Sequence, residues 1–142
     1  MTSPIAPPLG PVLETGLYVA DLEKARRFYE ELLGLSVMFH DERVAAYDAA
    51  PGSVLLLFQQ GTTDTPAQLP GGTIPPHDGS GRLHYAFSIA PEYLQPWRDH
   101  LATHGIVIEG EVRWPKGGVS LYFRDPDGHL VELATPGLWE NY

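Results

Sequence analysis

The sequence predicts an α+β fold built from two tandem βαβββ modules. Two internal alignments support this prediction. Residues 13–17 align without a gap with residues 83–87, and the turn at 51–52 with the strand after it aligns with the turn at 127–128 and its strand. The order of elements agrees, because each half of the chain reads as one strand, one helix and three further strands.

The first module is expected over about residues 12–60. An apolar run rich in β-formers predicts a strand at Val12–Val19. Asp21 is a good helix N-cap, and apolar residues at helical spacing continue to Gly34, where we expect the helix to end. Three short strands follow, at Leu35–His40, Val44–Tyr47 and Val54–Gln59.

The second module is expected over about residues 82–135. A strand is predicted at Leu83–Ile89, and a helix whose apolar face includes Leu94 and Leu101 ends at Gly105. Three short strands are predicted after it, at Ile106–Ile108, Val119–Phe123 and Leu130–Leu133.

Two segments fall outside the modules. Residues 1–11 hold four prolines and indicate an extended arm, and residues 61–81 indicate a loop because they hold four prolines and five glycines. At this length we expect residues 1–142 to form a single domain.

Composition excludes several classes of protein. The chain has no cysteine, which excludes disulfide frameworks and thiolate chemistry. The formal net charge is −9, so we expect neither nucleic acid nor anionic membrane as a partner. The N-terminal residues lack the pattern of a signal peptide, and a cytoplasmic location is therefore expected.

Strand alternation indicates a site. Glu14 and His84 occupy equivalent positions in the two modules, and Glu132 occupies the position equivalent to Leu56. Each of the three charged or polar residues interrupts the face of small residues on its strand. A lone glutamate or histidine in a strand is ordinarily a surface or core residue. Their joint placement instead makes Glu14, His84 and Glu132 candidate ligands of one divalent metal ion.

Two segments carry a resemblance to a known family. LYVADLEKARRFYEELLGL and YFRDPDGHLVEL resemble the first strand and helix and the final hairpin of the vicinal oxygen chelate superfamily, which includes glyoxalase, bleomycin resistance and extradiol dioxygenase proteins. The resemblance covers about residues 12–135. It implies a half-open mixed β-barrel around a metal site, with Glu14, His84 and Glu132 as ligands of Fe, Mn, Ni, Co or Zn.

Other residues are placed at the site by strand parity or by this resemblance. Tyr122, ten residues before Glu132, resembles a tyrosine that faces the metal and is a candidate catalytic donor beside Glu14 and Glu132. Ser120 and Arg124 share its parity and are candidate substrate-binding residues, although an arginine at a turn is ordinarily exposed. His77 joins them if the long loop forms a lid.

The reaction is left open between several classes. Leu56 replaces a fourth ligand and argues against glyoxalase I, Gly16 argues against a fosfomycin transferase, and Glu14 argues against an extradiol dioxygenase. We expect a metal-dependent dioxygenase, isomerase or lyase acting on a small substrate with vicinal oxygens. The alternative is a metal-free binding protein of the bleomycin resistance type.

The expected oligomeric state bears on the candidate metal site. The resemblance implies a homodimer, in which a neighbouring chain can donate Glu14, and Trp139 and Tyr142 leave apolar groups for a partner to cover. The three ligands should converge on one point. A Glu14 that points into solvent would instead favour the metal-free binding protein.

Overall fold

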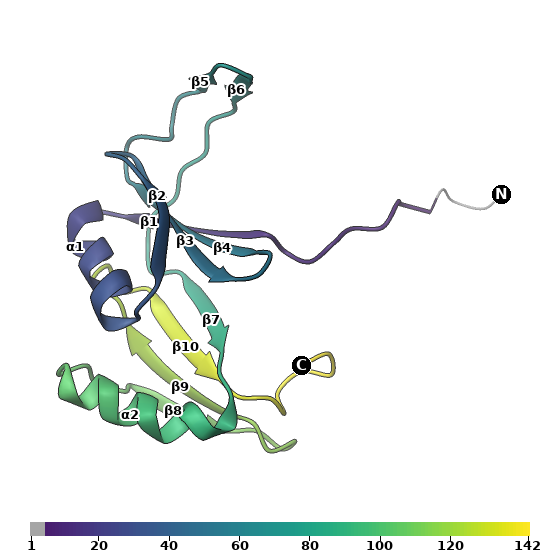
Figure 1. Ribbon diagram of the computed structural model, residues 1–142, viewed down its shortest axis with the longest axis vertical. Helices are drawn as coiled ribbons and strands as arrows, with labels where there is room; N and C mark the ends of the chain where they lie inside the picture. Colours follow the sequence, from purple (N-terminus) through teal and green to yellow (C-terminus); the bar gives the residue numbers. More distant parts are fainter. Residues whose placement is uncertain (1–4) are drawn as a thin grey trace.

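The computed structural model describes residues 5–142, which form two four-stranded sheets, each with its own helix (Figure 1). The first module contains β1 (Glu14–Val19), α1 (Leu22–Arg27), a π-helical turn η1 (Phe28–Leu32), β2 (Ser36–His40), β3 (Val44–Ala50) and β4 (Ser53–Gln59). The second contains β7 (His84–Ser88), a short 3₁₀ turn η2 (Pro91–Tyr93), α2 (Leu94–Thr103), β8 (Gly110–Arg113), β9 (Val119–Arg124) and β10 (Leu130–Ala134).

The strand registers confirm the duplication. The sheet orders are β1-β4-β3-β2 and β7-β10-β9-β8, and in each sheet the first pair is parallel while the others are antiparallel. Gly16 pairs with Leu56 in the first sheet, and Ala86 pairs with Glu132 in the second. Leu56 and Glu132 are therefore equivalent, as predicted. Neither sheet closes on itself, which agrees with the expected half-open arrangement.

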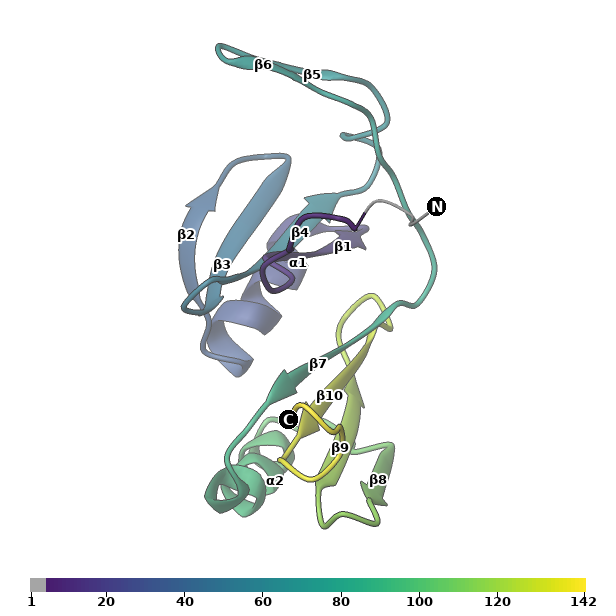
Figure 2. The same cartoon turned by 90° about the vertical axis from the view of Figure 1, so that its right-hand side faces the viewer.

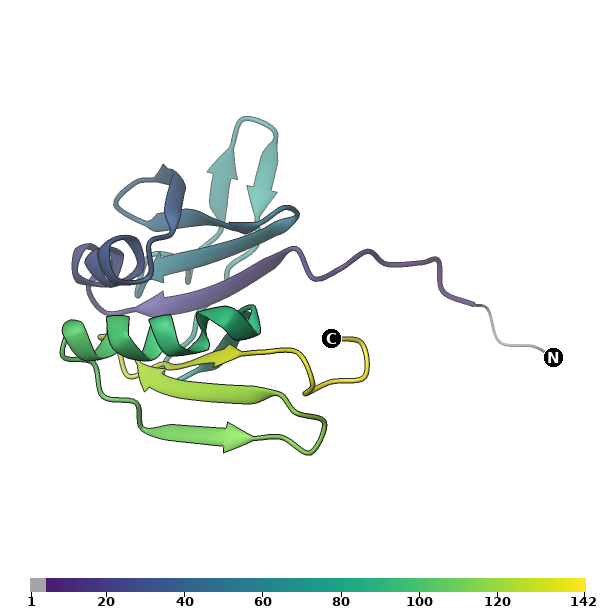
Figure 3. The same cartoon turned by 60° about the horizontal axis from the view of Figure 1, so that its bottom comes forward.

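Each sheet buries one face against its helix. In the first module Leu17 and Val19 of β1 pack with Ala25 of α1, and all three are buried. In the second, Leu133 of β10 packs with Leu101 of α2, which runs along this sheet (Figure 3). Each fully buried aliphatic side chain contributes about 1.5–3 kcal/mol. The opposite face of each sheet is left for the site.

The two modules lie one beside the other (Figure 2). Hydrogen bonds made by side chains at their junction hold them together. Tyr85 donates a hydrogen bond to the hydroxyl of Tyr29, which donates to Asp125. His129, also buried, accepts from the amide of Leu83 and donates from Nε2 to the carbonyl of Tyr18. Buried polar groups of both modules are thus satisfied by each other.

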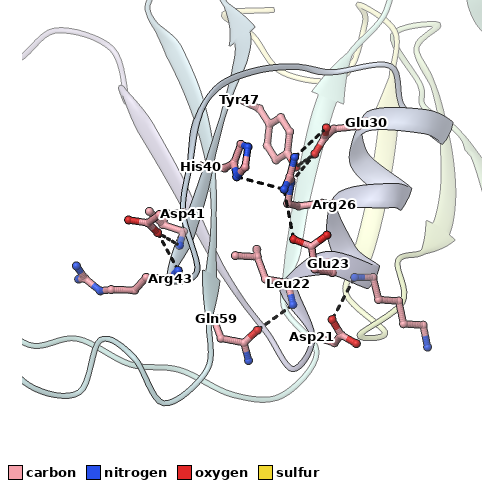
Figure 4. A network of polar contacts seen from close by, with 12 residues as sticks. Asp21, Leu22, Glu23, Arg26, Glu30, His40, Asp41, Arg43, Tyr47 and Gln59 are labelled. Carbon is pink, nitrogen blue, oxygen red and sulfur yellow. Dashed lines mark hydrogen bonds and ion pairs between the residues drawn. The ribbon is translucent and has the colours of Figure 1, made fainter.

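Polar contacts fix the start and the outer face of α1 (Figure 4). Asp21 accepts from the amide of Lys24, the N-cap contact expected from the sequence. Arg26 donates to Glu30, which also accepts from the hydroxyl of Tyr47 on β3. The helix is therefore tied to its sheet by charge-assisted hydrogen bonds as well as by its apolar face.

Two expectations from the sequence need correction. Ile106–Ile108 was predicted as a strand, but the strand is β8, Gly110–Arg113. The amide of Ile106 donates to the carbonyl of Leu101 at the end of α2. The side chains of Ile106 and Ile108 pack on the apolar core of the second module, which contains Leu101 and Leu133. The loop 61–81 contains a hairpin of its own, β5 (Ala67–Leu69) and β6 (Gly72–Ile74).

The expected N-terminal arm lies partly outside the described residues. Residues 5–13 are exposed and run away from the two modules, without helix or strand (Figure 1). Within residues 5–142 no helix is both long enough and apolar enough to cross a membrane.

Candidate metal centre

His84 and Glu132 lie side by side on the open face of the second sheet. His84 begins the edge strand β7, and Glu132 lies in the adjacent strand β10. Nε2 of His84 is 3.2 Å from Oε1 of Glu132, and their side chains are 50% and 8% exposed. An imidazole nitrogen and a carboxylate oxygen thus meet at a point that solvent reaches from the His84 side.

The histidine ring is oriented by the backbone. Nδ1 of His84 lies 2.9 Å from the carbonyl oxygen of Leu130, which can only accept, so Nδ1 carries the proton. In the neutral ring the lone pair is then on Nε2, which faces Glu132. This is the arrangement typical of a metal-binding histidine, whose second nitrogen donates to a carbonyl.

The carboxylate is oriented by a buried serine. Oε2 of Glu132 accepts from Oγ of Ser120 at 2.6 Å, and Ser120 has no exposed surface. Oγ of Ser120 in turn accepts from Nε1 of Trp114 at 2.8 Å. Trp114 was not among the predicted site residues. The sequence signal for it is the turn composition of residues 115–118, Pro-Lys-Gly-Gly. This turn brings Arg113, at the end of β8, opposite Val119, at the start of β9.

Tyr122 lies on the same face. It pairs with Glu132 across β9 and β10, and its ring centroid is 6.3 Å from that of His84. Burial, followed by the nearby Glu132 charge, raises the pKa of the Tyr122 hydroxyl above its usual value. The hydroxyl therefore keeps its proton at neutral pH and remains a hydrogen-bond donor.

Glu14 does not join this pair within one chain. It is exposed at the start of β1, in the other sheet. No three histidine, aspartate or glutamate residues among residues 5–142 are close enough to hold a metal ion together. One chain brings together two of the three predicted ligands. This exposure is the arrangement that the sequence analysis associated with a metal-free binding protein.

The long loop is attached to the open face of the first sheet. Nδ1 of His77 is 2.6 Å from the hydroxyl of Tyr18, and its ring packs edge-on against Phe58 with centroids 4.7 Å apart. Tyr18 shares the parity of Glu14 on β1, so His77 packs at the Tyr18 end of the face that carries Glu14. Leu56, on β4, is paired with Gly16 in this first sheet, whereas Glu132 lies in the second sheet.

Arg124 is already engaged by neighbouring groups. Its Nε donates to Oε2 of Glu109 at 2.9 Å, and another guanidinium nitrogen donates to the carbonyl of Gly128 at 3.1 Å. In this geometry it stabilises the final hairpin.

A cavity of about 180 Å³ lies beside Glu132. Its floor is the small face of the second sheet, with Ala86 and Ala134, and its wall is the C-terminal segment with Leu138 and Trp139. Tyr142 holds that segment in place by donating to the carbonyl of Ala134 at 2.7 Å. A larger hollow of about 410 Å³, between η1 and α2, contains none of the site residues and is remote from this chemistry.

Comparison with known proteins identifies the family. The model of the Glyoxalase/Bleomycin resistance protein/Dioxygenase superfamily matches residues 11–133, which span both modules and include Glu14, His84 and Glu132. The chain belongs to this superfamily. The structure of lactoylglutathione lyase from Agrobacterium tumefaciens superimposes with a TM-score of 0.85 at 30% identity, over 94% of this chain and 99% of that one.

Two curated relatives carry names that describe an activity. The glutathione transferase FosA of Serratia marcescens is 32% identical over 86% of this chain and 78% of its own length. The metallothiol transferase FosB of Bacillus licheniformis is 30% identical over 86% of this chain and 73% of its own. Together with the family match, these relatives favour a metal-dependent enzyme of the vicinal oxygen chelate type over a metal-free binding protein.

Proposed function

We propose that the chain is a divalent-metal-dependent enzyme that acts on a small substrate with vicinal oxygen atoms. In this proposal His84 and Glu132 of one chain and Glu14 of a second chain hold the metal. The observation that carries it is the 3.2 Å approach of His84 Nε2 to Glu132 Oε1, with both side chains oriented by further hydrogen bonds.

The donor set fits a divalent cation. One neutral imidazole and two carboxylates balance a charge of +2, and such mixed ligands suit Mn, Fe, Co, Ni or Zn. A nearly buried Glu132 carboxylate is costly without a positive partner, and a shared dication removes that cost. When bound, the metal would supply Lewis-acid stabilisation of negative charge on a substrate oxygen.

The residues around the pair have separate roles in this proposal. The Tyr122 hydroxyl donates a hydrogen bond to the substrate oxygen that gains charge. The cavity between Ala86, Ala134 and Trp139 holds the rest of the substrate. His77, which packs at the Tyr18 end of the Glu14 face, would line the opposite side of the site when the two open faces meet.

A homodimer completes the site. The chain exposes apolar side chains on the arm and at the start of β1, where Leu9 is 96% and Val12 81% exposed. A second copy would cover this surface and carry Glu14 to the partner's His84 and Glu132. The exposure of Glu14 in one chain then follows from the assembly and gives no support to a metal-free protein.

For the reaction, we propose non-redox chemistry. The similar proteins are named as thiol transferases and as a lactoylglutathione lyase, so transfer or lyase chemistry is favoured over dioxygenation. Gly16 argues against the transferase class, but the two transferase relatives return this class to consideration. Against lyase chemistry, apolar Leu56 occupies the position at which a four-ligand lyase site has its fourth ligand.

Metal analysis tests the proposal. Protein purified without chelator should contain a stoichiometric divalent metal, and Glu14→Gln, His84→Ala and Glu132→Gln should each lose most of it. Glu109→Gln, which alters a carboxylate paired with Arg124, is the matched control and should retain it. Metal-free wild-type protein that cannot be loaded with any of these dications would overturn the proposal and favour a small-molecule sequestering protein.

A further inference from the structure

We propose that Trp114 is a positioning residue for Glu132 and acts on it through Ser120. The proposal rests on the proposed function only in taking Glu132 as a metal ligand.

The direction of the hydrogen-bond chain is fixed by its first member. The indole nitrogen of Trp114 can only donate, so the Ser120 oxygen must accept from it, over 2.8 Å. A hydroxyl has a single proton, and that of Ser120 is directed to Oε2 of Glu132, over 2.6 Å. Without the indole, the hydroxyl would be free to rotate toward another acceptor.

The hydrogen bonds from Trp114 to Ser120 and from Ser120 to Glu132 determine which carboxylate oxygen of Glu132 faces the metal position. Oε2 of Glu132 is occupied by Ser120, so Oε1 is turned toward Nε2 of His84. An anchored oxygen fixes the plane of the carboxylate and favours coordination through the other oxygen alone. Ser120 is fully buried, so its hydroxyl serves Glu132 and is not exposed to a substrate.

Backbone contacts hold Trp114 in place. Its amide donates to the carbonyl of Gly118, and the amide of Gly117 donates back to the carbonyl of Trp114. Gly118 lies so close to Gly137 that a Cβ on it would be 2.8 Å from the Gly137 carbonyl carbon. This turn, packed against the C-terminal segment, sets the indole over Ser120, which lies on β9.

The test compares Trp114→Phe, Ser120→Ala and the double variant in the full-length protein. Mn²⁺ affinity is measured by the electron paramagnetic resonance signal of free Mn²⁺. Loss of such an outer partner typically costs about 10–100-fold in metal affinity, and we expect this for Ser120→Ala. Trp114→Phe should weaken Mn²⁺ binding in the same direction, and the double variant should bind no more weakly than Ser120→Ala alone.

Trp97→Phe, which alters the tryptophan of α2, is the control and should leave the affinity unchanged. The proposal is wrong if Trp114→Phe binds Mn²⁺ within about twofold of wild type, or if the two substitutions add in the double variant.

A metal-free measurement separates this proposal from the proposed function. The indole N–H resonance of Trp114, assigned by its loss in Trp114→Phe, should shift and exchange faster with solvent in both Ser120→Ala and Glu132→Ala. An unaltered resonance in Glu132→Ala overturns the positioning role. If the wild-type protein binds no dication but both variants show the shift, only the proposed function is overturned.

Discussion

Tyr122 pairs with Glu132 across the antiparallel strands β9 and β10, so the two side chains lie on the same face of the sheet. The parallel pairing of His84 with Leu130 places the histidine on this face as well. A phenol that burial and a carboxylate keep protonated therefore lies next to two proposed metal ligands. This relationship makes the role of Tyr122 separable from metal binding.

Tyr122→Phe should leave the metal content unchanged and lower the turnover of an identified substrate. Loss of one hydrogen-bond donor to a developing oxyanion typically lowers the rate by about 10²–10³-fold. Metal analysis and steady-state kinetics measure the two effects, and Tyr93→Phe, an exposed tyrosine, is the control. An unchanged kcat would reduce Tyr122 to a packing residue.

Much of the site face could be predicted because a strand has a period of two. The parity of Glu14, His84 and Glu132, and the equivalence of Leu56 with Glu132, need only the repeat and a strand assignment. The role of Trp114 could not be predicted in this way. It depends on how a turn folds back on the next strand, and strand parity says nothing of that.

The two elements that differ from the prediction have different causes. Ile106 and Ile108 have the composition of a strand, but they cover the second core after α2 and the pairing begins only at Gly110. In the loop 61–81 the high proline and glycine content hid the short hairpin β5–β6. Tertiary packing overrode local propensity at the two isoleucines, whereas the largely exposed β5–β6 hairpin is held by its own strand pairing.

The hydroxyl of Tyr29 should matter for stability more than that of Tyr85. Tyr29→Phe removes the donor to Asp125 and the acceptor for Tyr85, leaving buried polar groups without partners. We expect a loss of about 1–3 kcal/mol in the free energy of unfolding. Tyr85→Phe removes only the terminal donor and should cost less. Urea unfolding of both variants measures the difference, and equal losses would contradict it.

Stability should fall in acid partly through Glu30. The hydrogen bond from Arg26 is the main cause that holds the pKa of this carboxyl below its usual value of 4.5, and Tyr47 adds a second hydrogen bond. Because the folded pKa lies below the unfolded one, the stabilisation is present above the unfolded pKa and is lost as the pH falls through the folded pKa.

Glu30→Gln should therefore destabilise the protein at pH 7 and flatten its stability profile below about pH 4.5. Chemical unfolding at a series of pH values measures both effects. Glu23→Gln, on the same helix but with a 75% exposed side chain, is the matched control and should change the profile little. A Glu30→Gln profile parallel to that of wild type would contradict the assignment.

The source of Glu14 can be decided with hybrid dimers of two inactive variants. If each metal site combines Glu14 of one chain with His84 and Glu132 of the other, a dimer of Glu14→Ala and Glu132→Ala chains has one site with both defects and one intact site. If all three ligands come from one chain, each site of the hybrid carries a defect.

Chains with different affinity tags, co-expressed and purified through both tags, give the hybrid alone. We expect it to recover about half of the wild-type metal content per dimer, while both parent homodimers stay nearly metal-free. A metal-free hybrid of correct size and fold would show that Glu14 acts within its own chain or does not bind metal.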